Sequence, residues 1–63
     1  MGIDDRIEEV RRLLERVRSY NRLVFSDNFE PGTIADMKGN AKDICDQAKA
    51  EIDEIKDEID QWS

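Results

Sequence analysis

Apolar residues recur along this chain at alternating steps of three and four, on both sides of a segment rich in turn-forming residues. Such spacing places side chains along one face of an α-helix, and a sustained 3.5-residue repeat is typical of helices that pack along a seam. The first stripe comprises Ile3, Ile7, Val10, Leu14, Val17, Asn21 and Val24. The second comprises Ala41, Cys45, Ala48, Ile52, Ile55, Ile59 and Trp62. The pattern predicts an all-α fold, an antiparallel two-helix hairpin.

Turn and capping residues predict where each helix begins and ends. The first helix is expected over about 4–25 and is followed by a loop over 26–32 that contains Asp, Asn, Pro and Gly. The second helix has two possible starts, because Pro31 is tolerated in a first turn and Thr33 has an acid three residues later. Thr33 is the preferred N-cap, and the helix is expected over about 33–62. Gly39–Asn40 is the weak point of this helix, where we expect a kink or a closely packed neighbour.

The stripes also predict which side chains are buried between the helices. Folding at the loop brings Leu14 near Cys45, so Cys45 is expected to be a buried packing residue. Asn21 is expected to be the one polar member of the core, where such a residue sets the register of helix pairing. Four further apolar residues are expected to lie beside the stripes: Leu13, Tyr20, Phe25 and Ile44.

The chain has 63 residues, which is one domain and too few to bury a large core. A single cysteine excludes an internal disulfide, and the absence of histidine disfavours a structural metal site. Oligomerisation is the remaining common means of stabilising so short a chain. Ile59 and Trp62 extend past the start of the first helix. The sequence therefore predicts a homodimeric four-helix bundle.

The formal net charge of −6 is unevenly distributed. Residues 1–25 carry six Arg and five acids, whereas residues 33–63 carry nine acids and four Lys. Overall acidity disfavours non-specific binding to nucleic acid or to anionic membranes. No apolar run exceeds three residues, so no membrane span or signal-peptide core is predicted. The lone cysteine suits a reducing interior, and a cytoplasmic protein is expected.

Enzymatic activity is not expected. Without histidine, Cys45 has no histidine partner that would activate it as a nucleophile, and the chain has no glycine-rich phosphate loop. The acids of segment 53–58 form carboxylate pairs at helical spacing, but an acidic face of this kind is usually solvated rather than metal-bound. No cofactor and no metal are predicted.

A non-enzymatic protein–protein interaction module remains as the favoured function, a small adaptor or regulator that acts as a helical-hairpin dimer. Large apolar residues beside charge are typical of contact sites, and the partner is a protein that the sequence does not name. The predicted contact residues are Trp62, Ile59, Phe29, Asp57 and Glu58.

Two alternatives stay open. The dense carboxylates of segment 51–60 suit an acidic inhibitor that occupies the nucleic-acid-binding site of another protein, as phage-type nucleic-acid mimics do. Alternatively, a hairpin dimer could contact RNA phosphates through an arginine-rich face of the first helix. The residues of that face are Arg11, Arg12, Arg16 and Arg18. Salt-dependent binding to a basic enzyme would favour the first alternative, and binding to structured RNA the second.

Overall fold

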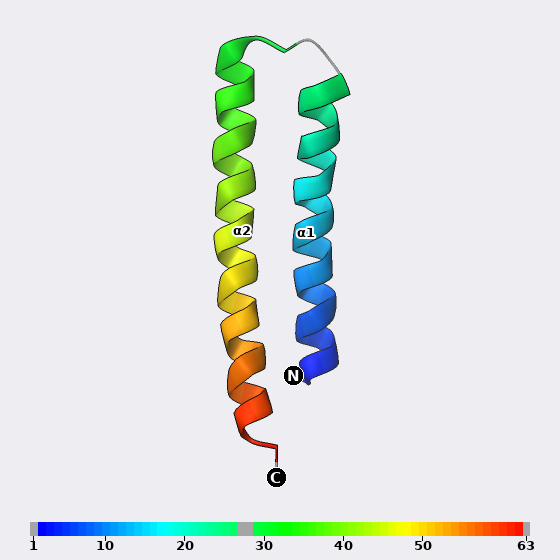
Figure 1. The fold of residues 1–63 in the computed structure, drawn as a ribbon, viewed down its shortest axis with the longest axis vertical. Helices are drawn as coiled ribbons and strands as arrows, with labels where there is room; N and C mark the ends of the chain where they lie inside the picture. Colours follow the sequence, from blue (N-terminus) through cyan, green and yellow to red (C-terminus); the bar gives the residue numbers. More distant parts are fainter. Residues whose placement is uncertain (1, 27–28, 63) are drawn as a thin grey trace.

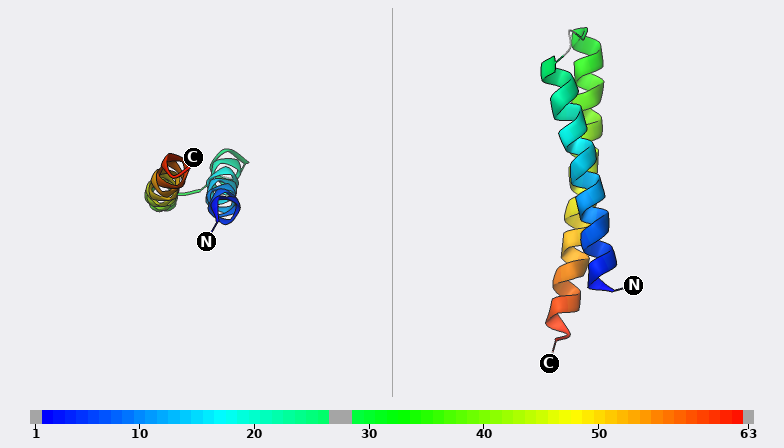
Figure 2. Two further views of the ribbon diagram at one scale, coloured as in Figure 1. Left: turned by 90° about the horizontal axis from the view of Figure 1, so that it is seen from below. Right: turned by 90° about the vertical axis from the view of Figure 1, so that its right-hand side faces the viewer.

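The computed structural model describes residues 2–26 and 29–62 as two long helices joined by a short loop. Helix α1 spans Ile3–Ser26 and helix α2 spans Pro31–Asp60. They run antiparallel, and both chain ends lie at the end of the rod opposite the loop (Figure 1). Views from two other sides show the helices adjacent along their length (Figure 2). The predicted antiparallel hairpin is therefore confirmed. Asp27 and Asn28 of the predicted loop lie outside the described residues.

Helix α2 begins two residues earlier than its predicted N-cap. Pro31 is the first helical residue, and Glu30 precedes it with an extended backbone and no side-chain capping bond. The amide of Ile34 donates to the carbonyl of Glu30 at 3.1 Å, which closes the first turn. The prediction of Thr33 as N-cap is wrong because proline suits the first helical position, where its fixed φ is favourable and its missing N–H would have had no partner.

Helix α2 continues without interruption through Gly39, so the expected kink is absent. A Cβ atom built at Gly39 would meet no atom within 4 Å outside the adjoining helical backbone. The other expectation for this site, a closely packed neighbour, is therefore also wrong. Gly39 lies on the open side of the helix, where its cost is conformational entropy rather than a fault in packing.

The packed seam keeps the alternating three- and four-residue spacing in both helices. Its most buried residues are Leu13, Ile44 and Ala48, against which Val17 and Tyr20 pack. On α1 the buried and half-buried positions of the seam are Ile3, Arg6, Val10, Leu13, Val17, Tyr20 and Val24. On α2 they are Ile34, Met37, Ala41, Ile44, Ala48, Glu51, Ile55 and Glu58.

This seam differs from the predicted stripes at every second position. Leu13, Tyr20 and Ile44, which were expected beside the stripes, lie in the seam, whereas Leu14, Asn21 and Cys45 are exposed. The predictions of a core asparagine, a buried cysteine and a packed contact between Leu14 and Cys45 are therefore wrong. Phe25 lies outside the seam as expected and is exposed.

Both registers share Val10, Val17, Ala41 and Ala48, so the choice depends on the residues between them. In the loop-proximal half, the observed register packs the larger Tyr20 and Ile44 in place of Asn21 and Cys45, which buries more apolar surface. In the half nearer the chain ends, the observed register places charged residues in the seam instead of apolar ones. Three charged residues, Arg6, Glu51 and Glu58, take the seam positions, and Ile7, Ile52 and Ile59 are turned outward.

Candidate interaction surface

Large aliphatic side chains are exposed in a row along one side of the hairpin. Ile7 and Leu14 of α1 are 51% and 50% exposed, and Ile52 and Ile59 of α2 are 44% and 40% exposed. Cys45, seven residues before Ile52, is exposed as well. These five residues are called the apolar stripe below. Each of them directly follows a seam residue in the sequence.

Antiparallel packing is what places both halves of the apolar stripe on the same side. Each residue along a helix is turned by about 100° from the one before it, always in the same sense when viewed from the N-terminus. Because α1 and α2 run in opposite directions, the residues that follow seam positions turn to a common side of the pair. Leu14 therefore lies level with Cys45, and Ile7 lies level with Ile52, across the two helices.

An open groove of about 290 Å³ continues this side of the hairpin toward the loop. Its walls include Asn21 of α1 and Lys38 of α2, each seven residues from a member of the apolar stripe. Between them, Phe25, Ile34 and other apolar side chains form the lining. Asn21 and Lys38, one heptad closer to the loop than the apolar stripe, thus face one shared groove. The apolar stripe and the groove together run nearly the full length of the molecule.

The margins of the apolar stripe are basic although the chain is acidic. Lys42, Lys49 and Lys56 occupy the next position outward on α2, each three residues before a stripe residue. Arg11 and Arg18 occupy the equivalent position on α1, each four residues after a stripe residue. These five residues are called the basic rims below. Six acids of α2 lie on its other outward faces: Asp36, Asp43, Asp46, Asp53, Asp57 and Asp60.

The two basic rims differ in how their charges are paired. On α1, the Arg18 guanidinium lies 3.2 Å from Glu15, and Arg11 binds both carboxylate oxygens of Glu8. The hydrogen bond from Arg11 lowers the pKa of Glu8. Among residues 2–26 and 29–62, no ion pair joins the three lysines of the α2 rim to a carboxylate. The lysines of the α2 rim are thus not held in ion pairs, although Asp46, Asp53 and Asp60 follow them at i,i+4 spacing.

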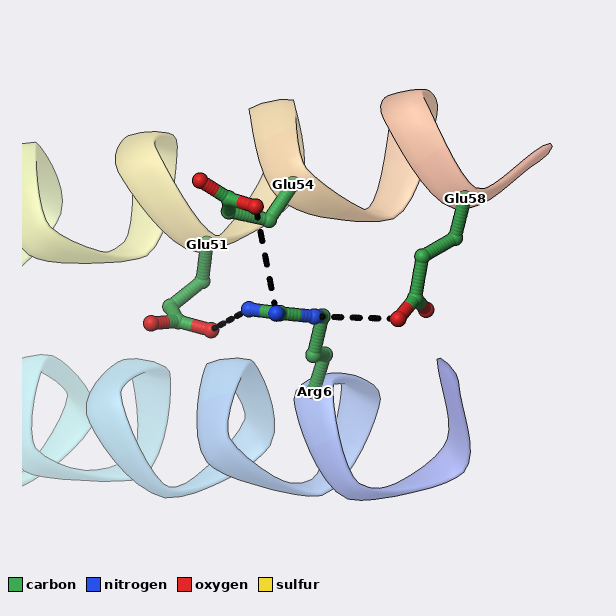
Figure 3. Close-up of polar contacts among 4 residues, drawn as sticks. All are labelled: Arg6, Glu51, Glu54 and Glu58. Carbon is green, nitrogen blue, oxygen red and sulfur yellow. Dashed lines mark hydrogen bonds and ion pairs between the residues drawn. The ribbon is translucent and has the colours of Figure 1, made fainter. Parts of the chain in front are cut away.

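A charged cluster replaces apolar packing at the open end of the seam (Figure 3). The Arg6 guanidinium lies 3.4 Å from Glu51, 3.8 Å from Glu54 and 3.4 Å from Glu58. Burial would by itself lower the pKa of Arg6, but the hydrogen bond that Arg6 donates to Glu58 and the three negative charges raise it. One cation of α1 thus joins three carboxylates of α2 and holds the ends of the helices together.

The structure distributes the predicted contact residues over separate parts of the molecule. Trp62 and Ile59 are exposed at the end of α2 that extends past the start of α1 (Figure 1). Phe29 is half-buried in the loop, at the opposite end of the rod. Asp57 is exposed on a face of α2 away from the apolar stripe, and Glu58 is bound to Arg6. Four of the five therefore share the C-terminal end of α2, on different faces of it, and Phe29 lies apart.

The four arginines predicted for RNA binding lie on two different sides of the hairpin. Arg11 and Arg18 lie on a basic rim, whereas Arg12 and Arg16 turn toward the opposite side of the hairpin. Arg12 lies 3.8 Å from Glu9, so three of the four arginines have a glutamate three residues before them as an ion-pair partner. The structure therefore brings no continuous arginine face together on α1.

Sequence reasoning placed Ile7, Leu14 and Ile52 in the core and so missed them as surface residues. A signal was present in the adjacent leucines at 13 and 14, which offer two registers for one seam. A second signal was the seven-residue spacing of Lys42, Lys49 and Lys56, which assigns these charges to one margin of one helix.

The chain matches no protein-family model, no curated protein and no solved structure. Roles for its residues therefore come from geometry alone. Neither helix, over the described residues, contains a stretch long and apolar enough to cross a membrane. Among the same residues, no three metal-binding side chains are grouped as a metal site requires.

Proposed function

We propose that this chain is a non-enzymatic protein–protein interaction module, a small adaptor or regulator that binds through its apolar stripe. The observation that carries the proposal is the row of half-exposed aliphatic side chains on one side of the hairpin. Scattered exposed apolar residues are ordinary, but a contiguous line of them at heptad spacing is typical of a surface that packs against further helices.

The simplest use of this surface is the predicted homodimer. Two hairpins that appose their apolar stripes would form a four-helix bundle and cover Ile7, Leu14, Ile52 and Ile59. The small size of the hairpin core supports this proposal, because few side chains are buried between α1 and α2. We place the protein in the reducing cytoplasm, because the exposed thiol of Cys45 would not stay reduced in an oxidising compartment.

Lysine substitutions on the apolar stripe test this proposal. Leu14→Lys and Ile52→Lys place a charge where a partner would pack, and both positions are already exposed in the hairpin, so the helices should still form. Leu23→Lys is the matched control, because Leu23 is 42% exposed on the opposite side. Light scattering coupled to size exclusion measures the oligomeric state, and circular dichroism checks the helix content.

We expect the wild-type chain and the Leu23 variant to self-associate at high concentration, and both stripe variants to remain folded monomers. Self-association that survives Leu14→Lys and Ile52→Lys would show that a different surface is used.

A second candidate is the acidic inhibitor of a nucleic-acid-binding protein. The observation that favours it is the arrangement of aspartates along the outward faces of α2, where Asp46, Asp53 and Asp60 recur at seven-residue spacing. Replacing these three by Asn would then abolish binding to a basic nucleic-acid-binding enzyme, whereas Leu14→Lys would not. Binding to RNA receives less support, because ion pairs engage three of the four candidate arginines.

A further inference from the structure

The apolar stripe has the dimensions of a site for one or two helices. Together with the groove, it extends from Lys38 to Ile59 over 22 residues of α2, which is about 30 Å at 1.5 Å per helical residue. Stripe residues recur every seventh position on both helices, so a straight amphipathic helix with apolar residues at heptad spacing could contact them in sequence. The groove bounded by Phe25 and Ile34 offers the same helix an apolar recess near the loop.

The basic rims indicate which charge the flanking residues of such a helix should have. Lys42, Lys49 and Lys56 line one margin of the apolar stripe, and Arg11 and Arg18 line the other. Residues that flank an apolar seam face the flanking residues of the partner and select it by charge. Opposite charges at these positions favour association, and like charges oppose it.

A second copy of the chain fits this charge pattern poorly. If two hairpins meet stripe to stripe, the lysine rim of α2 faces either the lysine rim of the other α2 or the side of the other α1 that carries Arg11 and Arg18. Turning one hairpin end over end exchanges these two arrangements and removes neither like-charge contact. Self-association through this face is therefore opposed by charge in either orientation.

We infer that the preferred occupant of the apolar stripe is an amphipathic helix of another protein whose apolar residues are flanked by acidic ones. This inference rests on the proposed function and specifies its partner. The acidic helix displaces the weaker homodimer because its carboxylates face the basic rims, whereas a second copy would present basic rims of its own. Of the six outward aspartates of α2, three lie on the far side of the helix: Asp36, Asp43 and Asp57. The other three, Asp46, Asp53 and Asp60, lie one position beyond the lysines, so the lysines stand between them and the acidic helix.

Two synthetic helical peptides test the inference against the full-length chain. Both consist of about three heptads with Leu at the seam positions, and they differ only in carrying Glu or Lys at the flanking positions. Like charges keep each peptide monomeric in solution. Fluorescence anisotropy of a labelled peptide measures its dissociation constant at low and at high salt. Vesicles of phosphatidylserine and phosphatidylcholine provide a separate arm, because an anionic membrane could also attract a basic-rimmed apolar surface.

We expect the Glu-flanked peptide to bind at least about tenfold more tightly than the Lys-flanked one, the difference that three surface ion pairs of ordinary strength would give. Its binding should weaken with salt, whereas homodimerisation should strengthen as salt screens the basic rims. The triple variant Lys42→Gln, Lys49→Gln, Lys56→Gln should lose the preference. The control Arg12→Gln, Arg16→Gln, Arg22→Gln removes the same charge from other faces and should retain it.

Other results overturn the inference in distinguishable ways. Equal binding of both peptides, abolished by Leu14→Lys, would show that the apolar stripe binds helices without selecting acids, and the proposed function would stand. Binding of neither peptide by a chain that dimerises would identify a second copy as the occupant. Binding of phosphatidylserine vesicles without binding of either peptide would identify a membrane surface. A folded chain that neither binds a peptide nor self-associates would refute the proposed function as well.

Discussion

Leu13 and Leu14 are adjacent in the sequence and have opposite surroundings, so their truncation to alanine tests the register of the hairpin. Leu13 is 4% exposed and packs against Ile44 and Ala48, whereas Leu14 is 50% exposed on the apolar stripe. The two substitutions remove the same atoms from neighbouring positions of one helix. Any difference in their effects therefore reports burial rather than helix propensity or composition.

The expected magnitudes follow from these exposures. Leu→Ala at a buried site usually costs about 2–5 kcal/mol, and a two-helix seam with open edges places Leu13 near the lower end, at about 2–3 kcal/mol. Leu14 buries only half of its side chain, so its truncation should cost about 1 kcal/mol or less. For a domain of this size, these losses correspond to a fall in Tm of roughly 10–20 °C for Leu13→Ala and about 5 °C or less for Leu14→Ala.

Thermal and urea denaturation followed by circular dichroism measures both variants. The chain must be dilute enough to be monomeric, because self-association would add to the contribution of Leu14. Ile44→Ala and Cys45→Ala form the corresponding pair on α2, with the first expected to destabilise and the second to have little effect. If Leu14→Ala is the more damaging substitution in the monomer, the seam follows the register of Leu14, Asn21 and Cys45, and the apolar stripe is not a surface.

Four further outcomes are expected. Gly39→Ala should raise the free energy of unfolding by about 0.5–1 kcal/mol in chemical denaturation, because a Cβ there meets open space and the helix is continuous; a loss of stability would indicate a packed neighbour. The Cys45 thiol should react with a soluble maleimide in the native monomer nearly as fast as in denaturant, and saturating Glu-flanked peptide should protect it; slow labelling of the free monomer would contradict the exposed position. Arg6→Gln should lower Tm by several degrees and more than Arg12→Gln does, since Arg6 joins α1 to three glutamates of α2 while Arg12 pairs only within its own helix; equal effects would deny the cluster a structural role. Asn21→Leu should leave the stability of the monomer nearly unchanged, because Asn21 is exposed; a gain of several kcal/mol would return it to the core.

The architecture could be predicted from the sequence because both registers imply it. Apolar residues at heptad spacing on two sides of a Pro- and Gly-containing loop permit two packed antiparallel helices whichever residue of each adjacent pair faces inward. The register could not be read in the same way. The stripe containing Ile7, Leu14, Ile52 and Ile59 is the more uniformly apolar one, yet the observed seam packs Tyr20 and Ile44 where that stripe offers Asn21 and Cys45. Because the seam keeps one heptad spacing along the hairpin, burial of Tyr20 and Ile44 near the loop leaves Ile7 and Ile52 exposed near the other end.

The exposure of the apolar stripe is a consequence of the register that the hairpin adopts. At the open end of the hairpin, Arg6 and its three glutamates satisfy one another in the seam, and ion pairing there releases Ile7, Ile52 and Ile59 to the outside. Charge totals could not show what borders them, because segment 33–63 is strongly acidic as a whole. Only the heptad position of each charge shows that lysines line the apolar stripe while aspartates face away. The proposed selection of an acidic partner therefore depends on opposite charges that act at short range along one margin of a chain that is acidic overall.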